Sequence, residues 1–82
     1  MLDIERRPNF LKAISKIKDN SLKKQIKKQI SKIIKNPKVG KPMRYGRKGT
    51  RELYIKPFRL SYAYLENENK IVFLDFYHKK KQ

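Results

Sequence analysis

The sequence predicts a single α+β domain, in the order β-α-α-β-β-β, in which a helix hairpin packs on one face of a small, mostly antiparallel, twisted sheet. Apolar residues recur at helical spacing in the first half of the chain and alternate with polar residues in the second half. The connections between the last three expected strands are short, which favours antiparallel neighbours. A chain of 82 residues has room for one core, so we expect one domain over residues 1–82.

The first expected elements are a short strand and a helix. Apolar and acidic residues alternate in "MLDIE", from Met1 to Glu5, as in a strand with one buried face. A helix from about Pro8 to Lys18 follows, because proline suits the first helical position. Its apolar residues recur at helical spacing: Phe10, Leu11, Ile14 and Ile17.

A second helix is expected after the segment Asp19–Ser21, which has the chemistry of a turn and an N-cap. The pair Asn36-Pro37 ends this helix, because the residue before a proline disfavours the helical conformation. The short turn makes the two helices an antiparallel hairpin. The outer faces of both helices carry lysines, which we interpret as a solvated surface. The apolar stripe of the second helix consists of Leu22, Ile26, Ile30, Ile33 and Ile34.

A basic loop is expected from Lys38 to Gly49, where glycine and proline interrupt any regular pattern and no acidic residue occurs. Gly46 and Gly49 flank Arg47-Lys48, so the backbone could approach a phosphate closely. A mobile basic loop explains the same pattern equally well. The loop lacks the GKS or GKT sequence of a nucleotide-binding P-loop.

Two strands are expected in "GTRELYIKPFRLSYAYL", from Gly49 to Leu65, with a bend at Lys56-Pro57. Arg51 precedes the alternating pattern and could point to either side of the sheet. The alternation directs one set of side chains toward the helices: Leu53, Ile55, Phe58, Leu60, Tyr62 and Tyr64. The opposite face, which we call the open face, receives Glu52, Tyr54, Lys56, Arg59 and Ser61.

The polar turn Glu66–Asn69 leads into a strongly apolar last strand, "KIVFLDFYH". Two helices can cover one face of the sheet, so the open face meets water or a ligand. The alternation directs Val72, Leu74 and Phe76 toward the core. The open face then receives Ile71, Phe73, Asp75, Tyr77 and Lys79.

The charge balance indicates a polyanionic partner. Lys and Arg number 23 against 7 Asp and Glu, a formal net charge of +16. Such an excess favours nucleic acid first, an acidic protein segment second and an anionic membrane surface a distant third. A lysine-rich, merely solvated surface is the alternative explanation.

Several classes of site are excluded by composition. The chain has no cysteine and one histidine, His78, which leaves no thiolate nucleophile and no Cys/His metal cluster. No apolar run approaches the roughly 20 residues that a membrane helix needs. The N-terminus has charges too early for a secretory signal, so we expect a cytoplasmic protein.

The open face combines cations with aromatic rings: Lys56, Arg59 and Lys79 accompany Tyr54 and Tyr77. Cations bind phosphates, and flat rings stack on unpaired bases, so this face is a candidate RNA-binding surface. Arg59 is the first candidate, because a guanidinium on a rigid strand can hold a phosphate through two donors. The alternative role of Arg59 is an ion pair with Glu52 or Asp75 on the same face.

The succession of a basic loop, "RELYI", "FRLSYAY", a polar turn, an apolar strand and "HKKK" resembles the RelE/ParE superfamily of toxins from toxin–antitoxin modules. The resemblance covers nearly the whole chain. Its most specific part is the aromatic-Arg-Leu-x-Tyr segment Phe58–Tyr62. The His-Arg pair common at the end of the last strand in this superfamily stands here as His78-Lys79. The parity of His78 points to the core, so a packed histidine is expected rather than a base.

The resemblance implies a RelE-like toxin, an mRNA interferase that cleaves messenger RNA in the ribosomal A site and so inhibits translation. The reaction would be attack of a ribose 2′-hydroxyl on the adjacent phosphate, with no metal and no cofactor. The implied partners are the ribosome, messenger RNA and an acidic RelB-like antitoxin. A ParE-like toxin that inhibits DNA gyrase and a non-catalytic basic protein that binds RNA or the ribosome are the alternatives.

The resemblance also implies roles for individual residues. Arg59 matches the strand arginine of the superfamily and would stabilise the phosphorane charge. Lys79 stands where the terminal arginine usually lies and would share this role or protonate the leaving oxygen. Tyr77 or Tyr54 would replace a tyrosine that the RelE branch commonly has beyond that arginine. The expected catalytic residues are Arg59, Lys79, Lys56 and Tyr77. The residues expected to contact RNA are Arg44, Arg47, Lys48, Arg51, Tyr54, Lys80 and Lys81.

Overall fold

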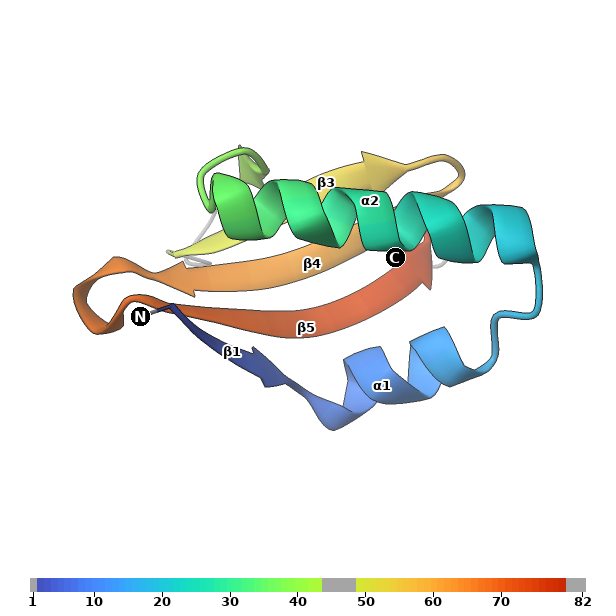
Figure 1. Cartoon of the computed structure of the whole chain (residues 1–82), viewed down its shortest axis with the longest axis horizontal. Coiled ribbons are helices and arrows are strands. Elements are labelled where there is room, and N and C mark those ends of the chain that lie inside the picture. The colour runs from blue at the N-terminus through green and yellow to red at the C-terminus, as the bar shows by residue number, and fades with distance from the viewer. Residues whose placement is uncertain (1, 44–48, 80–82) are drawn as a thin grey trace.

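The computed structural model describes residues 2–43 and 49–79, and in them two helices cover one face of a mixed sheet (Figure 1). The five strands of the described residues lie in the order β1-β5-β4-β3-β2. β1 runs parallel to β5, and the other neighbours are antiparallel. The predicted fold class is confirmed. The elements are β1 (Asp3–Arg6), α1 (Pro8–Ser15), α2 (Asn20–Lys35), β2 (Lys41–Pro42), β3 (Thr50–Ile55), β4 (Phe58–Leu65), the 3-10 turn η1 (Glu66–Glu68) and β5 (Lys70–His78).

The helices begin and end close to the predicted residues. Pro8 opens α1, which ends at Ser15 rather than at Lys18. The Asp19 carboxylate accepts a hydrogen bond of 2.9 Å from the Ser21 amide, so Asp19 is the N-cap of α2. The two helices run in opposite directions and lie apart over the sheet, α2 across β3 and β4 and α1 beside β5 (Figure 1).

The core lies between the helices and the sheet. Phe10 stacks on Phe73 with a distance of 5.2 Å between ring centroids, which joins α1 to β5. Leu11 and Ile34, expected in the apolar stripes, are 50% and 38% exposed, because each lies on the outer side of its helix. The buried cluster consists of Phe10, Ile26, Ile33, Ile55, Leu60, Tyr62, Ile71, Phe73 and Phe76.

A β-bulge in β5 makes part of the predicted alternation wrong. Ser61 pairs with Asp75, but the next residue, Tyr62, pairs with Phe73, so Leu74 is an extra residue in the ladder. Because of this extra residue, each side chain of β5 before Leu74 points to the face opposite to the one that strict alternation predicts. Ile71 and Phe73 therefore belong to the buried core, although the alternation had directed them to the open face. Val72 is also buried, as expected, but on the other side of the sheet, and Leu74 is half-buried. Phe76 remains on the core side, as predicted.

A short edge strand lies within the segment predicted to be a loop. β2 pairs with β3 through Lys41 opposite Glu52 and Pro42 opposite Arg51. Proline is tolerated there because an edge strand has one side without ladder hydrogen bonds. Among the described residues, no helix is long and apolar enough to cross a membrane.

Candidate nucleic-acid interface

The open face is formed by β3, β4 and β5, whose registers align side chains across all three strands. The alternation that buries Leu53, Leu60 and Phe76 against the helices turns their neighbours in sequence to the other side of the sheet. Two rows of open-face side chains result, Glu52–Ser61–Asp75 and Tyr54–Arg59–Tyr77.

Glu52 is the centre of this face. One carboxylate oxygen, Oε1, accepts a hydrogen bond of 2.7 Å from Nη1 of Arg59, and the other, Oε2, accepts one from the Tyr77 hydroxyl. The side chains of Glu52 and Arg59 are 12% and 26% exposed, so the ion pair is largely shielded from solvent. The ion pair considered above as the alternative role of Arg59 is therefore present.

Sequence reasoning did not include Glu52 among the site residues, although it considered Glu52 as an ion-pair partner. The signal was available, because Glu52 has the parity of Tyr54 and is the acidic residue of β3. Two residues that are two positions apart on a strand place their side chains on the same face. The cross-strand neighbour of Tyr54 is Arg59, which puts Glu52 diagonally opposite Arg59.

Tyr54 and Lys79 form a second contact beside this ion pair. The Nζ atom of Lys79 lies 5.7 Å from the centroid of the Tyr54 ring, within the range of a cation–π interaction. The Lys79 amide donates a hydrogen bond of 3.0 Å to the Pro57 carbonyl, which holds the end of β5 against the β3–β4 turn. Tyr54 remains 51% exposed as a residue, so part of its surface is available for stacking.

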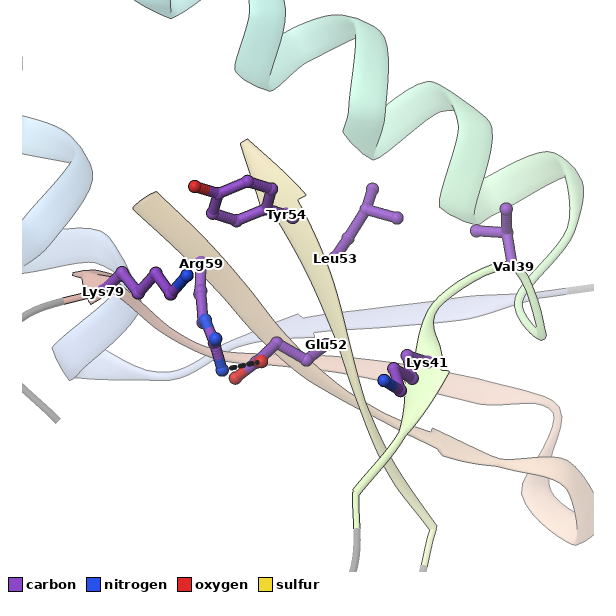
Figure 2. Close-up of a pocket in the computed structure, with 7 residues that line it drawn as sticks. All are labelled: Val39, Lys41, Glu52, Leu53, Tyr54, Arg59 and Lys79. Atoms are coloured by element: carbon purple, nitrogen blue, oxygen red, sulfur yellow. Dashed lines mark hydrogen bonds and ion pairs between the residues drawn. The ribbon is translucent and has the colours of Figure 1, made fainter. Parts of the chain in front are cut away.

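A hollow of about 350 Å³ brings these groups together (Figure 2). It lies along β3 next to the positions where β2 pairs, at Arg51 and Glu52. Figure 2 shows Lys79 reaching toward Arg59, with Tyr54 above and Glu52 below them. The residues that line the hollow are Val39, Lys41, Glu52, Leu53, Tyr54, Arg59 and Lys79.

Other predicted site residues lie elsewhere. Lys56 is exposed in the β3–β4 turn and does not line the hollow. Arg51 pairs with the buried Tyr62, and its Nη1 donates to the carbonyls of Lys38 at 3.0 Å and Gly40 at 2.8 Å. These bonds tie the connection after α2 to β3. The predicted RNA contacts Arg44, Arg47, Lys48, Lys80 and Lys81 lie outside the described residues.

His78 lies on the core side of the sheet. It pairs with Phe58 across β4 and β5, and the two rings form a T-shaped contact with a distance of 5.4 Å between their centroids. Within residues 2–43 and 49–79, no group of three or more His, Cys, Asp or Glu side chains is placed to hold a metal ion.

The fold is that of RelE-type toxins. It is similar to the isolated E. coli RelE toxin, with a TM-score of 0.82 and 13% identity over 100% of this chain and 88% of RelE. A chain of the E. coli RelBE toxin–antitoxin complex gives a TM-score of 0.80 and 14% identity over 95% of this chain and 96% of that chain. A chain of the RelBE2 complex from Mycobacterium tuberculosis gives 0.77 and 20% identity over 95% and 98%. At these identities the likeness establishes the fold alone.

The sequence itself decides the family. No curated protein matches the chain. A family model described as "ParE toxin of type II toxin-antitoxin system, parDE" matches residues 3–82. The chain therefore belongs to the ParE toxin family of the RelE/ParE superfamily, and it is a toxin of a type II toxin–antitoxin module.

Proposed function

We propose that this toxin acts as a RelE-like mRNA interferase, cleaving messenger RNA in the ribosomal A site, with Arg59 stabilising the charge that develops on the phosphate. One observation carries the proposal: Arg59, Tyr54 and Lys79 line the same hollow on the face opposite the core. A guanidinium, an exposed ring and an ammonium are the groups that hold a phosphate and an unpaired base.

The chemistry needs little from the protein, because RNA supplies its own nucleophile. The ribose 2′-oxygen attacks the neighbouring phosphorus, the bond from phosphorus to the 5′-oxygen breaks, and a cyclic phosphate and a 5′-hydroxyl result. Arg59 would bind the phosphorane oxygens, with donors beyond the Nη1 hydrogen bond to Glu52. Tyr54 would stack on a neighbouring base. Lys79 would neutralise the leaving oxygen or protonate it.

The proposed function implies RNA and an antitoxin as the partners of this toxin. The net charge of +16 suits messenger RNA and ribosomal RNA, and it also suits an acidic antitoxin. The complexes of E. coli RelBE and of the M. tuberculosis RelBE2 are toxin–antitoxin complexes with the same fold, which supports a RelB-like antitoxin for this chain. Ribosome-dependent action would place the toxin in the cytoplasm.

Toeprinting of a translating message tests the proposal with three proteins: wild type, Arg59→Ala, and Arg6→Ala as a matched loss of one exposed arginine on β1. We expect cuts at the A-site codon with wild type and Arg6→Ala, and cleavage slower by about 100-fold with Arg59→Ala. A message left intact by the wild type, or cut equally by Arg59→Ala, would overturn it.

A second function is favoured by the family model itself, which describes ParE toxins. In that case the toxin would inhibit DNA gyrase without nuclease chemistry. A supercoiling assay with purified gyrase separates the two: inhibition of gyrase together with an intact message would replace the first proposal. Binding of ribosomes with neither effect would instead indicate a non-catalytic RNA-binding protein.

A further inference from the structure

Glu52 connects two of the residues expected to act in catalysis. Its two carboxylate oxygens accept from different strands, Oε1 from Arg59 on β4 and Oε2 from Tyr77 on β5. The carboxylate stands on β3, so one group spans the three strands of the open face. Neither the family description nor the chemistry of the reaction assigns a role to this residue.

The arrangement restrains side chains that would otherwise be mobile. An arginine has several rotatable bonds, and holding its guanidinium in one place costs conformational entropy. Charge-assisted hydrogen bonds are strong, and the Glu52 side chain is only 12% exposed, so water competes weakly for its oxygens. Arg59 and Tyr77 are consequently fixed before any ligand arrives.

The same carboxylate opposes the binding of RNA. Its negative charge lies within 2.7 Å of the guanidinium that would hold a phosphate. A phosphate at Arg59 would therefore be repelled by Glu52, and the repulsion is strong where exposure to solvent is low. The Glu52 carboxylate thus both positions Arg59 and repels the phosphate, so its removal should change the binding of RNA and the rate of cleavage in different directions.

We propose that Glu52 is the positioning residue of this site: it fixes Arg59 and Tyr77 for the reaction and weakens the binding of RNA. The inference rests on the proposed RNA-cleaving function. Replacing Glu52 by glutamine removes the charge and keeps the size of the side chain. RNA should then bind more tightly, because the repulsion is gone, and react more slowly, because Arg59 is no longer held.

The experiment measures single-turnover cleavage of message on ribosomes at increasing toxin concentration, which separates the half-saturating concentration from the maximal rate. For Glu52→Gln we expect a half-saturating concentration lower by about threefold and a maximal rate lower by about 10-fold to 100-fold. Glu5→Gln is the matched control, because it likewise removes a carboxylate that holds two side chains. The partners of Glu5 are Lys70 at 2.9 Å and Arg7 at 3.3 Å. Both parameters should stay within about twofold of wild type in this control.

Two results would overturn the inference. An unchanged or raised maximal rate would mean that Glu52 does not position Arg59 productively. A slower rate with unchanged half-saturation, and a pH–rate profile that loses its acidic limb, would make Glu52 a general base instead. If Glu52→Gln does not fold, Tyr77→Phe removes one of the two contacts and keeps the charge. It should then lower the maximal rate without tightening binding.

A binding cycle keeps the inference testable if the wild type cleaves no message. Fluorescence anisotropy with a labelled single-stranded RNA measures Kd for wild type, Glu52→Gln, Arg59→Ala and the double variant at one salt concentration. Glu52→Gln should tighten binding about threefold when Arg59 is present and leave it unchanged in Arg59→Ala. Equal tightening in both backgrounds would show that Glu52 acts only through net charge, independently of Arg59.

Discussion

Tyr62 and Gly40, 22 positions apart in the sequence, are joined by a buried hydrogen bond of 2.8 Å from the Gly40 amide to the tyrosine hydroxyl. The same hydroxyl donates to the Pro37 carbonyl at 2.8 Å. Tyr62 thus holds the connection between α2 and β2 from inside the core. That connection carries Val39 and leads to Lys41, which form one wall of the candidate site.

Removing this hydroxyl should destabilise the protein. In Tyr62→Phe the Gly40 amide and the Pro37 carbonyl lose their partner at a position where Tyr62 is 0% exposed. We expect the free energy of unfolding to fall by about 2 kcal/mol. Urea denaturation measures it, with Tyr64→Phe on the same strand as the control, because its hydroxyl lies outside this contact. Equal losses for the two variants would refute the role of the Tyr62 hydroxyl.

Gly40→Ala should disturb the same contact from the other side. A Cβ atom at Gly40 would stand 2.6 Å from the Tyr62 hydroxyl and 2.8 Å from its Cε1 atom, so the ring or the backbone must move. We expect a loss of about 1–3 kcal/mol, measured by urea denaturation.

The loss of unfolding free energy caused by Gly40→Ala should be smaller when Tyr62→Phe is already present, because part of the clash of the new Cβ atom is with the Tyr62 hydroxyl. Gly49→Ala is the control: Gly49 has a φ of +82°, so alanine is strained there for a different reason, about 1–2 kcal/mol. Its cost should add to that of Tyr62→Phe. Additive costs for Gly40→Ala would contradict the contact.

The contribution of the Tyr62 hydroxyl to stability should depend on pH in the alkaline range. Burial raises the pKa of the Tyr62 hydroxyl above its ordinary value of 10.0, against smaller opposing effects of the Gly40 amide and the Arg51 charge. The unfolded tyrosine therefore ionises first. The stability from the neutral hydroxyl is complete below the unfolded pKa and is lost as the pH rises through the folded pKa. The difference in unfolding free energy between wild type and Tyr62→Phe should keep its full value up to about pH 9 and narrow between about pH 9 and about pH 11. A constant difference would exclude this linkage.

Much of the fold could be predicted because its strongest patterns are local. The N-cap at Asp19 and the faces of Leu53, Leu60 and Arg59 follow from chemistry within a few residues. The bulge at Leu74 could not be predicted in this way. It inserts one apolar residue into an apolar strand, and nothing in the composition distinguishes it from its neighbours.

The site was predictable to a smaller extent, because its geometry depends on pairs distant in sequence. Alternation placed Tyr54, Arg59 and Tyr77 on one face, but it does not show that Glu52 binds two of them at once. Arg51 was expected to contact RNA, whereas its guanidinium holds backbone carbonyls from the segment after α2. Such a contact depends on the path of that segment over the sheet.

Side chains of β4 point alternately to the core and to the open face, so neighbouring positions should respond differently to selection for folding and to selection for toxicity. In a saturation library sorted for folded protein, Leu60 and Tyr62, both fully buried, should accept few replacements. Arg59, which precedes Leu60 and points to the opposite face, should accept more. The same library sorted for growth arrest should be intolerant at all three positions. Variants that pass the first sort and fail the second would be harmless yet folded. They would keep every other surface of the toxin for capturing its natural partners from cells.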